Sequence, residues 1–569
     1  MRFRRVIFTV LFALAAVLLQ ADLILAPTPL QVFRNTDENW YGIVMNRLET
    51  MSCEQGIPVT FLFPERKGFH TCEYFKVLNS ISPFHDPIHK VIFLKSLARV
   101  LTLAAYCGLT FMVLGSALPG ILLGLWHFLD PGLESFKPLV TLISQTASGT
   151  PPLFTQSARL ISPLHYLLPG FALILCFIWL IRNQNRRNEN RKSARWKITA
   201  LSLPVFFWLL AMTPFYSWLP ILYILGCLVL YAWYFSERFT KVLLTSALVL
   251  GSGLILWEVH AKNGVLFESE VLPRVGFRKH CFEPIFFAHK GLIVASLLLA
   301  AMAYGVFKKR FLPALLVGGG LFLLVNINMV TGFEYQNYHF KDYLGPFYLG
   351  SIFLFLLWKF PQRRRWVLGI ALLVSVVGSY QYVKAQTSLP NGLATAEKEV
   401  DHDAILSFAR AHLEGKRVFC NLWNFELPLR ANVHCYWHHL MMAYPISDLE
   451  LLEMSIVQFK LQGLTRAQVE KLFAEEYSHP TLAVWSYGVK PEWIAGVPEN
   501  ERYRDGAALQ KFIPKWLDAY ENFPQSRLRE VLSEFDYLIL TRSHPAVASA
   551  LKVVQEFSEY GIYEPIAGI

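Results

Sequence analysis

The sequence predicts a polytopic α-helical membrane protein of about 11 transmembrane helices, followed by a C-terminal soluble α/β domain. Three observations predict this fold class. The 569 residues are 54% hydrophobic and only 17% charged, whereas about 25% of the residues in soluble proteins are charged. The apolar residues form blocks, and Lys and Arg gather between them. Near the C-terminus, short β-rich runs alternate with helical patterns instead.

The first predicted span is the N-terminal segment MRFRRVIFTVLFALAAVLLQADLILA, in which a basic start precedes a long apolar run. A cleaved signal peptide is the competing interpretation, but the run is long and ADLILAPTP is a poor cleavage site. A re-entrant segment at 117–129 would change the number of crossings. Further candidate spans lie at 98–116, 117–129, 164–181, 198–213, 217–235, 242–259, 291–306, 311–330, 345–360 and 366–383.

Lys and Arg in short connections set the orientation of such a chain, because they stay on the cytoplasmic side. They cluster at 182–197, 236–241, 308–310 and 363–365, as well as at the N-terminus. With this orientation the large loop 27–97, the loops 130–163, 260–290 and 331–344, and everything after about residue 384 lie outside. We therefore expect a transmembrane domain at 1–383 and an extracytoplasmic α/β domain at 384–569. A bacterial inner membrane is the expected location, and the net charge of +11 belongs to these loops rather than to a nucleic-acid site.

An acidic pair follows the first span in FRNTDENWYGIVMNRLE. Asp37 and Glu38 are candidates for a general base or for ligands of Mg²⁺ or Mn²⁺, although nothing in the sequence requires a metal. Repulsion between adjacent carboxylates raises the pKa of one of them. The alternative is that Thr36 caps a helix and that the two acids complement its dipole.

A second polar cluster lies in TGFEYQNYHFKDYLGPF, residues 331–347, between two apolar blocks. In a helix, His339 and Asp342 would be neighbours at i, i+3, and a carboxylate could orient the imidazole. Glu334 and His339 are candidate catalytic groups, while Lys341 and Asp342 are candidates for the phosphate or donor site. An interfacial aromatic belt with a snorkelling lysine is the alternative.

Other predicted outer loops carry cationic groups that could hold a phosphate near the lipid headgroups. Arg159 and His165 in TQSARLISPLHY are the candidates for donor binding. The stretches SPFHDPIHK and LPRVGFRKHCFEP supply further His, Lys and Arg residues. Non-specific contact with lipid phosphates is the alternative for each of them.

In the tail, KRVFCNLW and FDYLILTRS predict buried strands, and SDLELLEMSIVQFKLQG and TRAQVEKLFAEEY predict helices capped by Ser447 and Thr465. No Gly-rich phosphate loop follows a strand, so nucleotide binding is not expected. Two cysteine pairs, Cys53 with Cys72 and Cys420 with Cys435, are open candidates for disulfides if these regions lie outside the cytosol.

This arrangement resembles the GT-C fold of integral-membrane glycosyltransferases, and TDENWYG looks like their acidic motif in the first outer loop. The resemblance implies transfer of a sugar from a polyprenyl-phosphate donor to an extracytoplasmic acceptor. Asp37 or Glu38 would deprotonate the acceptor hydroxyl, and Lys341, His339 or Arg159 would stabilise the leaving phosphate. Two other classes stay open. One is a non-enzymatic scaffold whose tail binds a partner. The other is a lipid or solute transporter, which the scarcity of ionisable residues in the predicted spans disfavours.

Overall fold

The computed structural model describes eleven longer stretches and five short pieces of the chain. The longer stretches are 2–24, 79–129, 215–235, 290–331, 353–376, 401–420, 426–436, 447–476, 489–495, 512–542 and 550–566. The short pieces are 76, 241–253, 277–278, 282 and 334–335, and single gaps fall at 243, 247 and 374.

The first group of helices surrounds α5. Its members are α1 (Arg2–Leu19), α2 (Ala21–Ile24), α5 (Pro87–Leu114) and α6 (Leu118–Leu129). Helical residues at 353–359 and 364–373, on either side of the 3₁₀ turn Pro361–Arg363, pack on α5 and α6. The turn between α5 and α6 depends on Gly115, whose φ of 71° lies in the left-handed region that glycine tolerates. A side chain at Gly120 would meet the backbone of Cys107 at 2.3 Å, so glycine lets α6 approach α5 closely.

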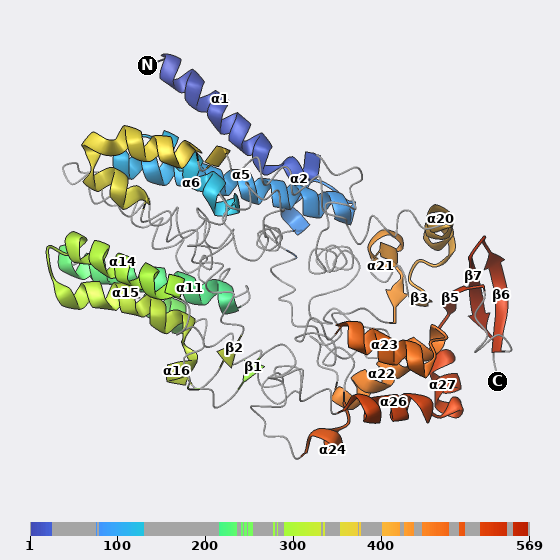
Figure 1. The fold of residues 1–569 in the computed structure, drawn as a ribbon. Helices are drawn as coiled ribbons and strands as arrows, with labels where there is room; N and C mark the ends of the chain where they lie inside the picture. Colours follow the sequence, from blue (N-terminus) through green and yellow to red (C-terminus); the bar gives the residue numbers. More distant parts are fainter. Residues whose placement is uncertain are drawn as a thin grey trace.

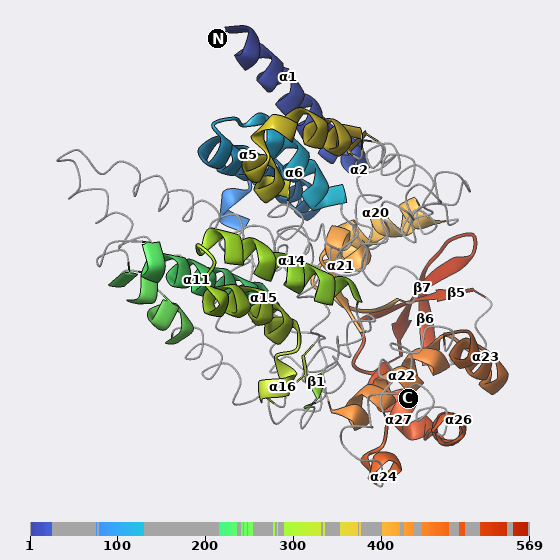
Figure 2. The same ribbon diagram turned by 60° about the vertical axis from the view of Figure 1, so that its left-hand side comes forward.

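The second group of helices lies beside the first in both ribbon views (Figure 1, Figure 2). It contains α11 (Phe215–Phe235), α14 (Lys290–Val306), α15 (Phe311–Val325) and the short α16 (Asn328–Thr331). The tight turn between α14 and α15 places Lys308 and Lys309 at positive φ. The Tyr223 hydroxyl on α11 donates to the Val317 carbonyl oxygen on α15, which fixes α11 against this hairpin.

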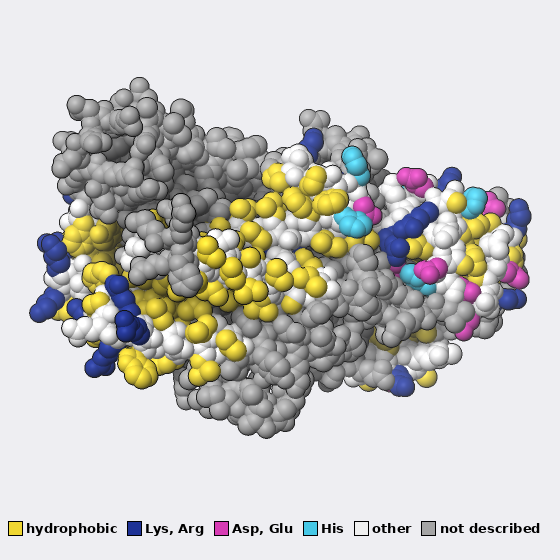
Figure 3. Space-filling view, turned by 90° about the horizontal axis from the view of Figure 1, so that it is seen from above, with side chains coloured by type: hydrophobic (Ala, Val, Ile, Leu, Met, Phe, Trp, Pro, Cys, Tyr) yellow, Lys and Arg dark blue, Asp and Glu magenta, His cyan; other side chains and the backbone are white. Residues whose placement is uncertain are grey.

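Apolar side chains cover much of the outside of these helices. Examples are Val10 and Leu14 on α1, Leu297 on α14, and Phe311 and Leu315 on α15, each at least half exposed. Figure 3 shows a broad hydrophobic surface on this part of the molecule, with Lys and Arg at its left end. Monomeric soluble proteins rarely expose so large an apolar area, and larger patches mark surfaces that contact a partner or a membrane.

The described helices coincide with several of the predicted spans, and one helix begins earlier than predicted. Within the described residues, one helical segment, Pro87–Phe111, has the length and composition to cross a membrane. Shorter apolar helices cover Val6–Leu19, Leu222–Phe235, Leu244–Gly253, Ser296–Val306 and Phe311–Val325. The helix expected to begin at residue 98 begins at Pro87, because Asp86 caps it and Pro87 occupies its first turn. Loop 27–97 therefore ends at Asp86. The spans at 164–181 and 198–213 lie outside the described residues.

The tail forms an α/β domain, as its alternating sequence pattern predicts. Its five strands are β3 (Arg417–Cys420), β4 (His434–Cys435), β5 (Tyr537–Thr541), β6 (Leu551–Glu556) and β7 (Tyr560–Pro565), in the order β4-β3-β5-β7-β6. β4, β3 and β5 are parallel, while β7 and β6 are antiparallel to their neighbours. Its helices are α20 (His402–His412), α21 (Glu426–Ala431), α22 (Asp448–Leu461), α23 (Arg466–Glu476), α24 (Pro491–Ile494), α26 (Ile513–Glu521) and α27 (Gln525–Leu532).

Alternation along β3 explains why helices lie on both faces of the sheet, because successive side chains point to opposite faces. Val418 and Cys420 pack against α20 and α21, in a cluster with Ile405 and Leu427. Phe419 faces the other side, where its ring meets those of Tyr436 and Phe535. A second core lies among the helices of that side, around the fully buried Trp516.

The predicted caps of two tail helices are confirmed. Ser447 accepts from the Glu450 amide at 3.1 Å, and Glu450 accepts from the Ser447 amide at 2.7 Å, which completes a capping box. Thr465 and Gln468 form the corresponding pair at the start of α23.

Cys420 and Cys435 are both buried and are not joined in a disulfide. The parallel register opposes Cys435 to Val418 and leaves Cys420 two residues further along β3. Cys53 and Cys72 lie outside the described residues.

Candidate functional site

Only one of the predicted site residues belongs to the described part of the chain. Glu334 lies in the two-residue strand β2 (Glu334–Tyr335). Asp37, Glu38, Arg159, His165, His339, Lys341 and Asp342 lie outside the described residues. Their predicted roles stay predictions.

The short strand β2 brings two predicted outer loops together. It pairs antiparallel with β1 (Phe277–Arg278), so that Arg278 is the register partner of Glu334 and Phe277 that of Tyr335. Residues directly opposite each other in such a pair have Cα atoms about 4.5–5.5 Å apart. The backbone thus pairs Arg278, from the predicted loop 260–290, with Glu334, from the predicted loop 331–344, although the two residues are far apart in the sequence.

An aspartate and a histidine contact each other at the start of α5. Asp86 accepts from the backbone amide of His89 at 2.9 Å and contacts the His89 ring nitrogen Nδ1 at 2.8 Å. Both side chains are about half exposed. These contacts account for Asp86 and His89 of SPFHDPIHK as an N-cap and its partner, so the structure gives them a local structural role.

Further along α5, three cations are enclosed by the protein. Lys90 and Lys95 are each 2% exposed and Arg99 is 0% exposed. The Arg99 guanidinium donates at 2.7 Å to the carbonyl oxygen of Leu19 and at 3.2 Å to Oε1 of Gln20, at the end of α1. Buried cations are costly unless anions or hydrogen-bond acceptors surround them, so such residues usually mark a site.

These three cations were not among the predicted site residues. They also add ionisable groups to a helix that the sequence analysis treats as a span nearly free of them. The predicted spans contain few ionisable residues because the span predicted at 98–116 begins after Lys90 and Lys95. A signal was nevertheless present in the sequence. Lys95 and Arg99 are four residues apart, the spacing that places two side chains on one face of a helix.

The tail carries a buried ionic network between α20 and α21. His402 Nε2 lies 2.8 Å from Glu426 Oε2, and Arg430 donates to Glu426 Oε1 at 2.7 Å. Glu426 is 1% exposed and His402 is 5% exposed. The hydrogen bond to Glu426 raises the pKa of His402 above its usual value, although burial opposes the shift. Since α21 also contacts α5, this network stabilises the part of the tail that meets the first helix group.

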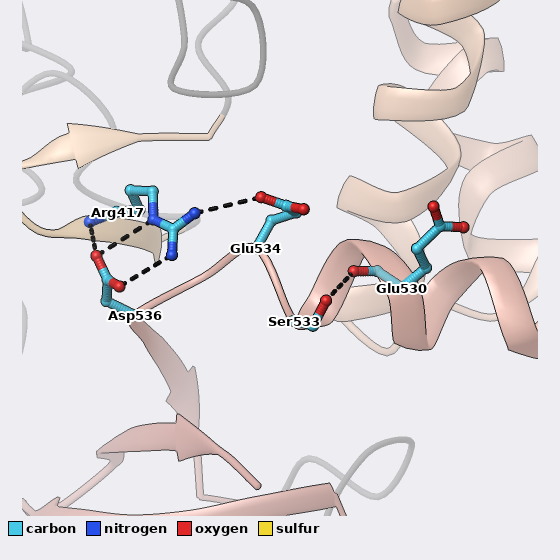
Figure 4. Close-up of polar contacts among 5 residues, drawn as sticks. All are labelled: Arg417, Glu530, Ser533, Glu534 and Asp536. Carbon is cyan, nitrogen blue, oxygen red and sulfur yellow. Dashed lines mark hydrogen bonds and ion pairs between the residues drawn. The ribbon is translucent and has the colours of Figure 1, made fainter. Parts of the chain in front are cut away.

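A second ionic cluster joins β3 to β5 at their N-terminal ends (Figure 4). Asp536 accepts from the Arg417 backbone amide at 2.8 Å and from its guanidinium at 3.1 Å, while Glu534 lies 3.2 Å from the same guanidinium. Burial opposes ionisation of Asp536, but these hydrogen bonds outweigh it and lower its pKa. The cluster fixes the register of the two parallel strands.

Among the described residues, no group of three or more His, Cys, Asp and Glu side chains is placed to hold a metal ion. The possible Mg²⁺ or Mn²⁺ ligands Asp37 and Glu38 lie outside them. No protein-family model matches this sequence, and no curated protein matches it either.

Proposed function

We propose that this chain is an integral-membrane glycosyltransferase that transfers a sugar from a polyprenyl-phosphate donor to an extracytoplasmic acceptor. The observation that carries the proposal is the two-ended arrangement of the helices. Basic turns gather at one end, while the pairing of β1 with β2 and the tail domain belong to the other. Such an arrangement would assemble a polar site on one side of the membrane.

The basic turns share their end through direct contacts. Lys308 lies 5.6 Å from the Phe235 ring and Arg310 lies 4.8 Å from the Tyr234 ring, so the turn after α14 adjoins the end of α11. Lys241 lies over Trp233 on that same helix end. These contacts bring two predicted cytoplasmic connections, 236–241 and 308–310, to one end, as the positive-inside rule requires.

The opposite end of the α14–α15 hairpin carries the polar groups. α14 follows β1 in the sequence, and α15 leads through α16 into β2. Asn326 and Asn328, next to the end of α15, are fully buried, and Glu334 follows shortly afterwards. These two side chains are enclosed by protein rather than exposed to lipid, and the Asn326 amide donates to the Phe322 carbonyl oxygen at 3.0 Å.

The chemistry rests on the resemblance to GT-C enzymes and on the acids of TDENWYG. Asp37 or Glu38 would take the proton of the acceptor hydroxyl as it attacks the sugar carbon. The bond from that carbon to the donor phosphate would break with inversion, and a nearby cation would stabilise the phosphate that leaves.

The test compares lipid-linked sugars and cell-envelope glycans in cells that carry the native chain or the double variant Asp37→Asn, Glu38→Gln. We expect loss of one glycan and accumulation of its lipid-linked donor, with the variant still inserted in the membrane. An unchanged glycan profile would refute the enzyme and would favour the scaffold.

Lipid transport is the second candidate, and the buried cations of α5 favour it, because transporters place ionisable groups within the membrane domain. Sidedness of the lipid-linked sugar separates the two functions. A transporter variant would leave the donor on the cytoplasmic face, whereas a transferase variant would leave it on the outer face.

A further inference from the structure

We infer that Arg278 is a positioning residue, which holds Glu334 at the polar site of the proposed transferase through the pairing of β1 with β2. The inference rests on the proposed function, because Glu334 is one of the site residues that the sequence predicts for it. The sequence groups Arg278 with cations that could hold a phosphate, whereas the strand register pairs it with an acidic residue.

The pairing of β1 with β2 closes one end of the α14–α15 hairpin. β1 precedes α14 in the chain, and α15 continues through α16 into β2. The turn at Lys308 and Lys309 joins the two helices at their other ends. β1 lies near α16 in both ribbon views (Figure 1, Figure 2). The segments that enter and leave the hairpin are therefore tied to each other on the side of the predicted outer loops.

The hairpin is a closely packed support for these two strands. Gly318 of α15 lies so near α14 that a methyl group there would be 2.5 Å from the Ser296 carbonyl oxygen. The Met329 amide donates to the Asn326 carbonyl oxygen at 2.9 Å, so α16 continues from α15 as a hydrogen-bonded turn. Glu334 begins β2 shortly after α16 ends. Its backbone is thus held by a short connection on one side and by β1 on the other.

The register divides the residues of the two strands into two pairs. Arg278 is opposite Glu334, and Phe277 is opposite Tyr335. Successive residues of a strand alternate between its faces, and residues directly opposite each other share one face. One face of the pair of strands therefore carries the two charged residues, and the other face carries the two aromatic ones. Opposite charges at such positions favour the pairing of the strands, whereas like charges oppose it.

An arginine beside Glu334 gives this residue a task distinct from that of the acids in TDENWYG. A nearby positive charge favours the ionised form of a carboxyl group. An ionised carboxylate accepts hydrogen bonds but has no proton to donate. Glu334 would therefore bind and orient a hydroxyl group of the acceptor, while Asp37 or Glu38 removes the proton. The planar fork of an arginine fixes a carboxylate more tightly than the single ammonium group of a lysine does.

The first experiment measures the strand pairing itself, without any transfer reaction. Phe277→Cys and Tyr335→Cys are combined in the full-length protein, and Cys281→Ser removes a thiol that is close in the sequence. Oxidation in isolated membranes should join positions 277 and 335, because directly opposite residues have Cα atoms about 4.5–5.5 Å apart. The control pair Phe277→Cys with Leu315→Cys, on the exposed face of α15, should stay unlinked. No link between positions 277 and 335 would overturn the inference.

Charge variants show whether the ionic pair contributes to the pairing. The rate of cross-linking between positions 277 and 335 is compared in four proteins: without a charge variant, with Arg278→Glu, with Glu334→Arg and with both. Each single variant places like charges opposite each other, so the rate should fall roughly 2- to 5-fold. The double variant restores opposite charges and should restore the rate. Equal rates in all four proteins would overturn the inference, because Arg278 would then exert no hold on Glu334.

Transfer separates a positioning role from a purely structural one. The measurement is formation of the glycan that disappears in the Asp37→Asn, Glu38→Gln variant, followed by pulse labelling in cells. Glu334→Gln should slow this formation at least roughly 10-fold, and Arg278→Gln should act alike because the carboxylate is no longer held. Arg278→Lys keeps the charge and should recover part of the rate. The control Lys309→Gln, exposed at the other end of the hairpin, should not change it.

The double variant of Arg278→Glu with Glu334→Arg gives the sharpest comparison. It should restore cross-linking but not transfer, because the carboxylate then lies on β1 instead of β2. Recovery of both would overturn the inference and would make the pair a structural contact only. Native transfer in Glu334→Gln would overturn it as well. If the Asp37→Asn, Glu38→Gln variant keeps every glycan, the proposed function is refuted together with the role of Glu334 in it, whereas the outcomes above overturn the inference alone.

Discussion

Removal of the Glu426 carboxylate should open the tail domain locally. This carboxylate is 1% exposed, and it accepts from His402 at 2.8 Å and from Arg430 at 2.7 Å. Glu426→Ala removes the anion that His402 of α20 and Arg430 of α21 share, and His402 then keeps a contact with the exposed Asp403, 3.0 Å from its other ring nitrogen. Breaking a buried pair by removing one partner costs about 3–5 kcal/mol. Since Arg430 is 22% exposed and can reach water, we expect the lower end, about 3 kcal/mol.

Hydrogen exchange measured by mass spectrometry on the full-length protein reports this change. A loss of about 3 kcal/mol corresponds to roughly 100-fold faster exchange of protected amides, if exchange occurs through opening of the domain. The peptides to follow are those of α20, α21 and β3, compared with the distant helix α15.

The matched control is Glu534→Ala, which removes a carboxylate from the Arg417 cluster (Figure 4). Glu534 is 52% exposed and Arg417 is 37% exposed, and exposed ion pairs contribute about 0–1 kcal/mol. Exchange should rise at most about 5-fold. Equal acceleration by both substitutions would show that burial does not set the energy of these pairs, and the reasoning about Glu426 would be wrong.

Three further outcomes are expected. The pKa of His402 is raised in the folded state, so its stabilising contribution is complete below about pH 6.5 and is lost as the pH rises through the raised pKa. The protection factors of α20 should therefore fall as the pH is raised above about 6.5, and an increase would contradict this. Gly318→Ala should lower the melting temperature, because the new methyl group would lie 2.5 Å from the Ser296 carbonyl oxygen. The control Gly319→Ala places its methyl group in open space and should leave the melting temperature unchanged or raise it. A lower melting temperature for Gly319→Ala than for Gly318→Ala would contradict the packing of α14 on α15. Ser447→Ala should destabilise the tail by about 0.5–2 kcal/mol in urea unfolding, and no change would show that the capping box is dispensable.

Local patterns in the sequence predicted most of the described elements. The apolar blocks at 217–235, 291–306 and 311–330 are helices, with ends within a few residues of α11, α14 and α15. KRVFCNLW and FDYLILTRS contain β3 and β5, and Ser447 and Thr465 are caps. Each of these features depends on residues that lie close together in the chain, so periodicity and capping chemistry suffice to find them.

The start of α5 shows where local patterns failed. Lys90 and Lys95 lower the mean hydropathy of the segment before residue 98, so hydropathy alone predicts a helix that begins at about residue 98. Asp86 and Pro87, which form the cap and the first turn, begin the helix earlier. The sequence contains both signals, and the cap at Asp86 and Pro87 determines where the helix begins. Whether a lysine is exposed or enclosed depends on neighbours from other segments.

The sequence by itself determined the apolar blocks that form helices and the alternation that gives the tail its strands and helices, because these are properties of neighbouring residues. Tertiary structure alone decided the register pairing of Arg278 with Glu334, the absence of a disulfide between Cys420 and Cys435, and the burial of Lys95 and Arg99. These features join segments that are distant along the chain. Their geometry follows from strand register and helix packing, which a single sequence does not specify.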